Sequence, residues 1–339
     1  MPKNVTIRDI AAEAGVSIAL VSFVMNNTTD ENGRRKYRVS EQSRERILAA
    51  AKRLNYQPNY AARTLRNGKT RFIGVVLSDI SNYFYGEIAR IVEEHIASKG
   101  YTMLLGNSNE NPEKFDKIIR TFIDRGAEGL IVVPCEGSLP TLDYISNCHI
   151  PVVVLDREDA PIRAPKVVLD NRKAMRTATD LLVSKGCRRI EMITYNMAIT
   201  TFRERERGYM DGISEAGLGP DVAKVHRVPF NDVEGGTLRL VPEILESDVD
   251  GLVFATNTLC IYTIKALRSM SCEPGSRIKV VGFDNSQAYD LLSPPVPHVQ
   301  QPIEEISAKC SELIFDLINK RIPQEDYICT LEGKLANAY

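Results

Sequence analysis

The sequence predicts an all-α unit at the N-terminus, followed by an α/β body built from two doubly wound parallel sheets. Two observations predict this organisation. Over residues 6–54, apolar side chains recur at helical spacing in short segments that are bounded by residues able to cap or break helices. From Arg71 onward, short apolar runs rich in Val, Ile and Leu alternate with helical stretches, which is the pattern of βαβ units in a buried parallel sheet.

Composition narrows the classes of protein to consider. The 339 residues are too many for one compact domain, and 43% hydrophobic and 26% charged residues are typical of a globular protein. The chain has no apolar run of membrane-spanning length and its first residues lack the apolar core of a signal peptide, so we expect a cytoplasmic protein without membrane contact. The 7 cysteines and 4 histidines are scattered without a CxxC pair, so the sequence predicts no metal site, no cofactor and no disulfide framework.

Charge is divided unevenly along the chain. Residues 1–70 contain 13 Lys and Arg against 6 Asp and Glu, whereas the remaining residues contain 30 against 38. A basic N-terminal unit on an acidic body suits a protein whose first part binds a polyanion.

Residues 6–26 read as two short helices joined by a tight turn. Thr6 can cap the first helix together with Asp9, Gly15 permits a positive φ at the turn, and Ser17 can cap the second helix. The inward-facing residues would be Ile7, Ile10, Ala11, Ala14, Val21 and Val24. This is the pattern of a helix-turn-helix, whose second helix lies in the major groove of DNA. An ordinary pair of core helices is the alternative.

The segments that follow complete a small N-terminal unit. Residues 27–38 are polar and end in a basic run, and Ser40 can cap a third helix with an apolar stripe. That stripe is predicted to consist of Ile47, Leu48, Ala51 and Leu54. Between Pro58 and Gly68 the sequence predicts a helix of one to two turns, which is too short to be stable without packing partners.

The predicted elements of the body alternate regularly. The strands span residues 72–77, 101–105, 129–133, 152–155, 189–194, 225–228, 250–255 and 278–282. The helices span residues 86–98, 112–124, 172–184, 203–216, 234–245 and 259–269. In such sheets ligands bind beyond the carboxyl ends of the strands, and a cleft between two lobes is a favoured binding site.

Seven segments, in order and at matching spacing, resemble the LacI/GalR family of bacterial transcription regulators. They are TIRDIAAEAGVS (6–17), LNYQPNYAARTLR (54–66), IGVVLSDISNYFYGEI (73–88), PVVVLDR (151–157), RERERGYMDGI (203–213), VFATN (253–257) and VVGFDN (280–285). The resemblance covers nearly the whole chain, and the combination of segments is far more specific than any one of them.

The resemblance implies a domain organisation and a function. It implies a helix-turn-helix domain (1–57), a hinge helix with its linker (58–70), and an effector-binding and dimerisation domain (71–339) like a periplasmic binding protein. One lobe would comprise residues 71–167 and 302–328, and the other residues 168–301 and 329–339. The chain would be a repressor in preference to an activator. Its effector, a sugar or related small metabolite, would bind between the lobes and change the affinity for DNA. The partners would be a near-palindromic DNA operator and a second copy of the chain, with a tetramer as the alternative.

The same resemblance implies which side chains contact DNA. These are Thr6, Ser17, Ile18, Ala19, Ser22, Phe23 and Asn26 in the head, and Ala62 and Leu65 in the hinge. Leu65 matches a leucine that wedges into a minor-groove step, and packing against a partner hinge is compatible with that role. The family commonly has Thr at the position of Leu20 and Arg at that of Phe23, so both departures remove polar contacts. Thymine methyl groups could still be read through Ile18, Ala19 and Phe23.

The loop 27–38 is longer than the family usually has between the second and third helices. We hypothesise that its basic residues contact flanking phosphates, whereas a solvated loop without a role in DNA binding is an equal alternative. The basic residues are Arg34, Arg35, Lys36 and Arg38.

Effector contacts are expected at or just beyond strand ends. The candidates are Asp79, Asn82, Phe84, Asp156, Arg205, Asn257 and Asp284. Arg205 and Asp284 are the strongest, because charge-assisted hydrogen bonds to hydroxyls or a carboxylate are strong and directional. A structural role, such as a helix cap or an ion pair between lobes, is the alternative for each. The chain has no Trp, so stacking on a sugar would fall to Phe84, Tyr83, Phe202 or Phe230.

Two other classes of protein share parts of this pattern. A solute-binding module of a transporter has a two-lobed body, but the basic N-terminal unit and the missing signal peptide argue against it. An α/β enzyme is disfavoured because the sequence has no nucleophile elbow, complete P-loop, metal cluster or glycine-rich dinucleotide turn. We therefore expect a regulator and no enzyme.

Overall fold

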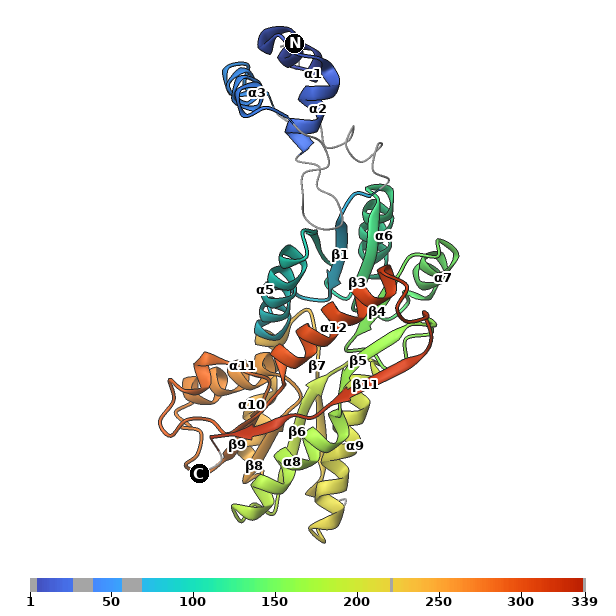
Figure 1. The fold of residues 1–339 in the computed structure, drawn as a ribbon. Helices are drawn as coiled ribbons and strands as arrows, with labels where there is room; N and C mark the ends of the chain where they lie inside the picture. Colours follow the sequence, from blue (N-terminus) through green and yellow to red (C-terminus); the bar gives the residue numbers. More distant parts are fainter. Residues whose placement is uncertain (1–4, 27–38, 57–68, 220–221, 338–339) are drawn as a thin grey trace. The chain divides into compact units, whose positions relative to one another are not determined.

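The computed structural model describes residues 5–26, 39–56, 69–219 and 222–337. The chain forms two compact units, which we call the head (Met1–Lys69) and the body (Thr70–Tyr339) (Figure 1).

The described part of the head contains three helices around one small apolar core. They are α1 (Ile7–Ala14), α2 (Ile18–Asn26) and α3 (Glu41–Arg53). The carboxylate of Asp9 accepts hydrogen bonds from the backbone N–H and the hydroxyl of Thr6, each at 2.7 Å, which fixes the start of α1. Gly15 ends the helix with φ 62°, and the N–H of Leu20 donates to Oγ of Ser17 at 3.2 Å. The predicted helix-turn-helix caps are confirmed.

The buried stripe of α3 differs from the prediction at one position. Leu48 is 45% exposed, whereas Ala50 is fully buried beside Ile47 and Ala51. The buried residues Ile47, Ala50 and Ala51 follow the helical spacing i, i+3, i+4, and the two alanines let α3 approach α1 and α2 closely. The prediction that Leu48 belongs to the core was wrong. It relied on the apolar side chain and neglected that residue 48 lies off the face defined by Ile47 and Ala51.

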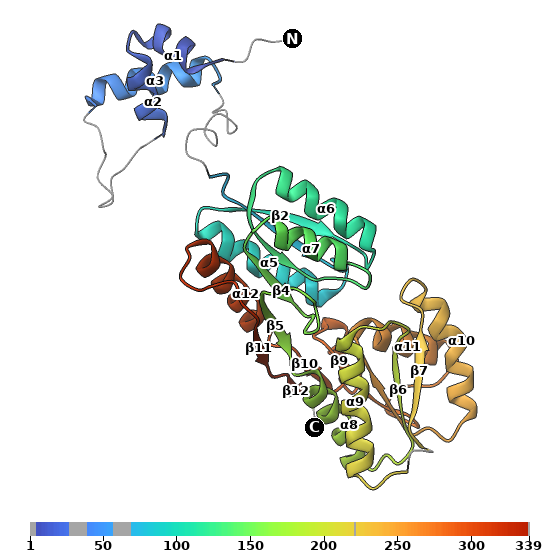
Figure 2. The ribbon, with the colours of Figure 1, turned by 90° about the vertical axis from the view of Figure 1, so that its right-hand side faces the viewer.

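The first lobe of the body contains a six-stranded parallel sheet. Its strands, in spatial order, are β2 (Thr102–Asn107), β1 (Phe72–Leu77), β3 (Ala127–Val132), β4 (Val152–Leu155), β5 (Pro165–Leu169) and β11 (Tyr327–Leu331). One face is covered by α5 (Tyr83–Ser98) and α12 (Ile303–Ile318), and the other by α6 (Pro112–Asp124) and α7 (Leu139–Asn147) (Figure 2). Two separate apolar clusters fill the two interfaces between sheet and helices.

The second lobe repeats the same strand order. Its strands are β7 (Lys224–Val228), β6 (Ile190–Tyr195), β8 (Gly251–Phe254), β9 (Lys279–Phe283), β10 (His298–Gln300) and β12 (Lys334–Ala336). The helices pack in two pairs, α8 (Asn171–Ser184) with α9 (Thr200–Glu215) and α10 (Val233–Glu246) with α11 (Asn257–Ser269). A short 3₁₀ helix, η2 (Gln287–Tyr289), follows β9. The predicted parallel arrangement is confirmed except at β12, which runs antiparallel to β10.

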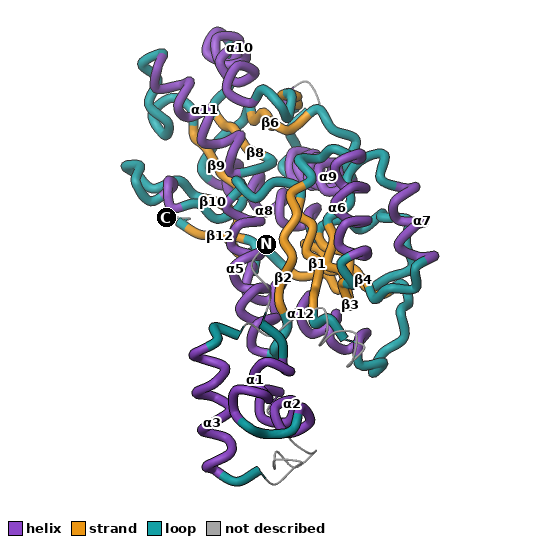
Figure 3. The backbone as a smooth tube through the Cα atoms, turned by 90° about the horizontal axis from the view of Figure 1, so that it is seen from above, coloured by secondary structure: helices purple, strands orange, loops and turns teal. Residues whose placement is uncertain are grey.

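The chain passes between the two sheets three times. It leaves the first sheet after β5, returns to it between β10 and α12, and leaves it again between β11 and β12. The strands β5 and β11 therefore extend the first lobe to Leu169 and Leu331, two or three residues beyond the predicted limits. Figure 3 shows the strands of each sheet gathered together with helices beside them.

Close approach of α8 and α9 depends on a glycine. A Cβ atom added to Gly208 would lie 2.0 Å from the backbone oxygen of Arg172, a contact that only movement of the two helices could relieve. We expect Gly208→Ala to lower the free energy of unfolding by about 1–3 kcal/mol, the usual range for overpacking. Chemical denaturation followed by circular dichroism measures it. Gly219→Ala is the control, because that position faces open space, and an equal loss in both variants would contradict the prediction.

Candidate functional site

The exposed side of the head includes the start of α2. Val21 and Val24 are buried in the head core, whereas Ser17, Ile18 and Ala19 are exposed. Thr6 is exposed as well, and Ser22 and Phe23 are half-buried. The N-terminal end of α2 thus offers side chains to a partner, as a recognition helix requires.

Leu20 lies on the other side of α2. It is half-buried and packs against the core of the head. Leu20 thus contributes to packing within the head, and the loss of a polar DNA contact at this position stays a prediction.

Several predicted DNA contacts lie outside the described residues. These are Ala62 and Leu65 of the hinge and Arg34, Arg35, Lys36 and Arg38 of the loop. The side chain of Asn26, at the end of α2, also lies outside the described part of the structure.

The body contains a narrow polar cleft between its two lobes. It is bordered by the carboxyl ends of β1, β4, β6, β8 and β9 and by the starts of α5 and α9. The lining residues are Ser78, Asp79, Asn82, Phe84, Tyr85, Glu110, Asp156, Arg157, Tyr195, Met197, Thr201, Phe202, Arg205, Phe230, Thr256, Asp284 and Gln301. The cavity volume is about 50 Å³, well below the roughly 300 Å³ at which small-molecule sites usually begin. The lobes must therefore separate to admit a ligand.

Two aspartates occupy equivalent places in the two lobes. Asp156 directly follows β4 and Asp284 directly follows β9, and their φ angles are 62° and 63°. Asp tolerates this left-handed conformation better than most residues. Both side chains are buried at the cleft, so each lobe presents one carboxylate from the end of its fourth strand.

The carboxylate of Asp156 belongs to a buried network in the first lobe. It accepts hydrogen bonds from the hydroxyl of Tyr85, at 2.8 Å, and from Nη1 of Arg157. Nη2 of Arg157 lies 2.7 Å from Oε1 of Glu110, and its Nε donates to the carbonyl of Pro134 at 3.1 Å. Burial raises the pKa of Glu110, and the charge of Arg157 only partly offsets this effect.

Arg205 is the buried cation that the second lobe places at the cleft. It is 3% exposed, its Nε donates to Oδ1 of Asn171 at 2.8 Å, and its Nη1 donates to the carbonyl of Ala255. The guanidinium lies 3.9 Å from the ring centre of Phe283. Loss of solvation lowers the pKa of Arg205, while burial raises the pKa of Asp284.

Asp284 is held by two neighbours. Nε2 of Gln301 donates to its Oδ1 at 2.6 Å, and the backbone N–H of Asn257 donates to its Oδ2 at 3.3 Å. The side chain of Asn257 is directed to the N–H of Thr258, at 2.7 Å, and Asn257 is not among the residues that line the cleft. The backbone of Asn257 thus positions Asp284, and an effector contact of its side chain stays a prediction.

Contacts across the mouth of the cleft hold the lobes together. The hydroxyl of Thr201 in α9 donates to the carbonyl of Asp156 at 2.8 Å. Nη2 of Arg203, two residues later in α9, lies 3.2 Å from the carboxylate of Asp159. Both contacts join the start of α9 to the loop after β4, and both must break when the cleft opens.

Family models match both units of the chain. A model for "Bacterial regulatory proteins, lacI family" matches residues 6–59, and one for "Periplasmic binding proteins and sugar binding domain of LacI family" matches residues 70–328. The chain belongs to the LacI family. It is a ligand-responsive, DNA-binding transcriptional regulator.

Curated relatives of this LacI-family protein match it along nearly its full length. The ribose operon repressor of Halalkalibacterium halodurans is 32% identical over 335 residues, which cover 97% of this chain and 95% of the relative. The transcriptional regulator RegA of Clostridium saccharobutylicum is 29% identical and is matched over 95% of this chain and 96% of its own length.

Solved structures share the fold of this LacI-family protein. The Lac repressor dimer bound to operator and an anti-inducer has a TM-score of 0.81 at 20% identity, with 98% of each chain covered. A LacI-type regulator from Alkaliphilus metalliredigens, solved with D-xylulofuranose, has a TM-score of 0.68 at 26% identity. That match covers 78% of this chain and 97% of the other.

The cleft of the LacI-family protein contains the other expected effector residues. Asp79, Asn82, Phe84, Asp156, Arg205 and Asp284 all line it. Asn82 also caps α5 by accepting the N–H of Phe84 at 2.9 Å, and Asp79 accepts the N–H of Ser81 at 2.9 Å. These two residues thus combine a place at the cleft with a local structural role.

The aromatic residues of the LacI-family cleft were partly foreseen. Phe84, Phe202 and Phe230 line it, whereas Tyr83 lines a separate cavity beside α5. Tyr195 was missed, although it makes edge contacts with Phe202 and Phe230 at 5.5 and 5.3 Å between ring centres. Burial raises the pKa of Tyr195 to about 12, so its hydroxyl stays protonated at neutral pH.

Sequence reasoning also missed Tyr85, Glu110, Arg157, Thr201 and Gln301 at the cleft of this LacI-family protein. Tyr85 and Arg157 are direct neighbours of predicted residues and could have been included with them. Glu110 and Gln301 come from a loop and from a crossing segment, for which the sequence offers no comparable signal.

The described residues contain no membrane-spanning helix and no group of metal-binding side chains. In them, no helix combines the length and the apolar character needed to cross a lipid bilayer. Nor do His, Cys, Asp and Glu side chains there gather into a group of three that could hold a metal ion.

Proposed function

We propose that this regulator is a homodimeric repressor that binds a near-palindromic operator. A carbohydrate bound in the cleft either releases the repressor from the DNA or strengthens its binding there. One observation supports the proposal above all. The same chain contains a helix-turn-helix in which the start of α2 is exposed and a two-lobed body with a polar cleft. A two-fold dimer sets two recognition helices about one DNA turn apart, which accounts for a palindromic site.

The nature of the effector rests on the cleft and on the relatives. Carboxylates, a guanidinium and aromatic rings meet in the cleft, and these groups bind the hydroxyls and the apolar face of a sugar. A ribose operon repressor is among the relatives, and a similar regulator was solved with D-xylulofuranose. Both support a monosaccharide as the effector of this chain.

The contacts outside the described residues are proposed from the sequence and the family alone. Leu65 would wedge into the central minor-groove step with Ala62 beside it. Arg34, Arg35, Lys36 and Arg38 would contact flanking phosphates, which would add to the salt dependence of DNA binding.

We also propose that the protein is not an enzyme and that it is located in the cytoplasm. The cleft groups are engaged with one another and with the backbone, as in a binding site, and no covalent step is assigned to them. A regulator that binds operator DNA works where the bacterial chromosome lies.

The test is selection of binding sites from random duplex DNA, with sequencing of the retained fragments. We expect one near-palindromic sequence to be enriched, and Ile18→Glu to reduce its binding roughly 10- to 100-fold, because a carboxylate would replace an apolar base contact. Leu48→Glu is the matched control, since Leu48 is 45% exposed on α3 and Ile18 is 44% exposed on α2.

Two results would contradict the proposal. Lack of any enriched sequence at low salt would remove the DNA-binding role. Equal losses in Ile18→Glu and Leu48→Glu would show that the effect comes from added negative charge on the head, and α2 would lose its assignment as the recognition helix.

A further inference from the structure

Negative charge prevails in the cleft between the lobes. Its lining includes the carboxylates of Asp79, Glu110, Asp156 and Asp284 but only the guanidiniums of Arg157 and Arg205. The remaining lining residues are uncharged. A ligand that brought a phosphate or a carboxylate into this space would add to an existing excess of negative charge.

The two guanidiniums are largely engaged by the protein itself. Arg157 donates to the side chain and carbonyl of Asp156, to Glu110 and to the carbonyl of Pro134. Arg205 donates to Asn171 and to the carbonyl of Ala255. Neither arginine is therefore a ready partner for an anionic ligand, although Arg205 has further N–H groups for a hydroxyl oxygen.

Two buried oxygen atoms at the cleft have no hydrogen-bond donor in good geometry among the described residues, although the hydroxyl of Ser78 lies near enough to Glu110 to lower the pKa of its carboxyl. They are Oε2 of Glu110 and Oε1 of Gln301. The side chain of Glu110 is 7% exposed, and its other carboxylate oxygen is bound by Arg157 at 2.7 Å. Gln301 must present its amide N–H groups to the carboxylate of Asp284, which can only accept, so its carbonyl oxygen is the atom that remains.

A buried acceptor without a donor is costly, and the cost is greatest for a charged one. A ligand hydroxyl would satisfy the hydrogen bond to Glu110 but would leave the excess negative charge in place when the cleft closes. A protonated amine supplies both the donor and the compensating charge. Burial already raises the pKa of Glu110, in agreement with a carboxylate that lacks sufficient positive charge nearby.

We infer that the effector carries a protonated amino group, bound by Glu110, on a hydroxyl-rich scaffold whose hydroxyls meet Gln301, Asp156 and Arg205. An amino sugar is the simplest molecule of this class. The inference rests on the proposed function, because it takes the cleft as the effector site and narrows the chemistry of the carbohydrate.

The test compares matched sugars that differ in one group. Binding of D-glucosamine and D-glucose, D-galactosamine and D-galactose, and D-mannosamine and D-mannose is measured by isothermal titration calorimetry on the full chain at pH 7. We expect at least one amino sugar to bind about tenfold or more tightly than its hydroxyl counterpart, with the preference fading as rising pH neutralises the amine.

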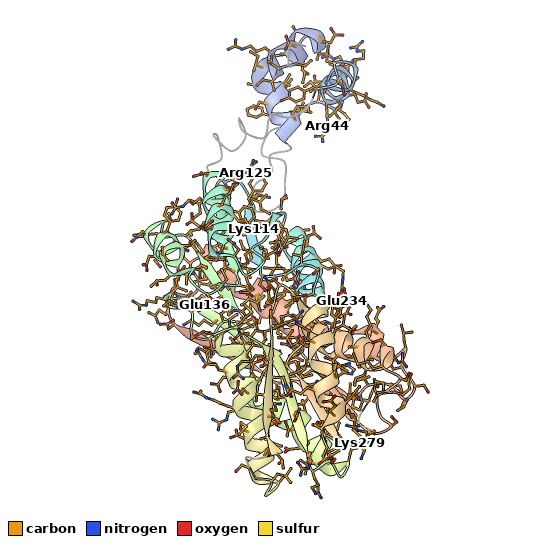
Figure 4. All side chains as sticks on the ribbon, turned by 180° about the vertical axis from the view of Figure 1, so that it is seen from behind. Arg44, Lys114, Arg125, Glu136, Glu234 and Lys279 are labelled. Carbon is orange, nitrogen blue, oxygen red and sulfur yellow. The ribbon has the colours of Figure 1, made fainter. Side chains whose placement is uncertain are left out.

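Two variants assign the effect to one residue. Glu110→Gln keeps the shape of the side chain but removes its charge. In this variant an amino sugar and its hydroxyl counterpart should bind with about equal affinity. Glu136→Gln removes the same charge from an exposed position outside the cleft lining, labelled in Figure 4, and should leave the preference intact. A preference that survives in Glu110→Gln would overturn the assignment.

The outcomes separate this inference from the function on which it rests. Binding of neutral sugars with equal or higher affinity than amino sugars would overturn the inference and leave the carbohydrate effector standing. Failure of all six sugars to bind, with DNA selection still successful, would overturn the inference while the DNA-binding role remained.

Discussion

Replacement of Arg157 by methionine is expected to lower the free energy of unfolding of the body by about 3–5 kcal/mol at pH 7.5, the usual cost of breaking a buried ion pair. Arg157 neutralises two carboxylates, those of Asp156 and Glu110, and all three side chains are no more than 8% exposed. Methionine fills part of the volume but removes the cation that neutralises these two buried negative charges. Urea denaturation followed by circular dichroism measures the loss.

The same variant should be less impaired in mild acid. Burial places the pKa of Glu110 in the folded chain above its ordinary value, so the folded state binds more protons than the unfolded state between those two pKa values. Stability linked to this group is therefore present at low pH and is lost as the pH rises through the raised pKa. Without Arg157 the pKa of Glu110 rises further, so the penalty of Arg157→Met should be smaller at pH 5 than at pH 7.5.

Two further variants test this explanation. Glu110→Gln combined with Arg157→Met should recover part of the lost stability, because one of the unpaired carboxylates is removed. Arg157→Lys should lose less than Arg157→Met, since a cation remains. A loss below about 1 kcal/mol for Arg157→Met, or the same loss at both pH values, would mean that the ion pairs are not what stabilises this part of the first lobe.

Local signals explain why some elements could be predicted to the residue. The bounds of β1, β4 and α6 agree with the prediction, because each is a buried apolar run or begins at a clear cap. Asn111 accepts the N–H of Lys114 at 2.8 Å, and Pro112 occupies the first turn of α6. In these cases the local sequence alone determines the element.

Elements defined by distant partners could not be predicted in this way. β11 is mostly exposed or half-buried and pairs with β5, which lies more than 150 residues earlier in the chain. β12 has three residues and is a strand only because β10 lies beside it. Neither strand has the continuous apolar run that identified the central strands.

The same distinction applies to the cleft. Asp156, Arg205 and Asp284 could be predicted because strand ends and helix starts converge at one edge of a doubly wound sheet. Glu110 and Gln301 could not, since a loop and a crossing segment reach the cleft only through the packing of whole lobes. Asn257 stands at the right place in the sequence, but its side chain is directed to its own helix start.

Replacement of Arg205 by lysine is expected to weaken effector binding about 100-fold while changing DNA affinity without effector by less than about threefold. Arg205 combines a fixed fork of donors with a stacked position 3.9 Å from the centre of Phe283, and lysine offers a single ammonium that cannot reproduce this geometry. Hydrogen bonds to a charged group contribute about 1.5–3 kcal/mol each, so the loss of one or two accounts for the factor. Lysine keeps the positive charge that lowers the pKa of the nearby Asp284.

The measurement is fluorescence anisotropy of the selected operator DNA, titrated with the sugar that binds most tightly among the matched pairs. Arg207→Lys is the matched control: Arg207 lies two residues later in α9, is 62% exposed and pairs with Glu204 of the same helix, so its replacement should leave both affinities unchanged. A response in Arg205→Lys within threefold of the unmodified chain would show that Arg205 serves only to join Asn171 and Ala255. Because the two variants make the same chemical change on one helix, a loss of effector affinity that is confined to Arg205→Lys and leaves operator affinity intact is assigned to what Arg205 contacts inside the cleft.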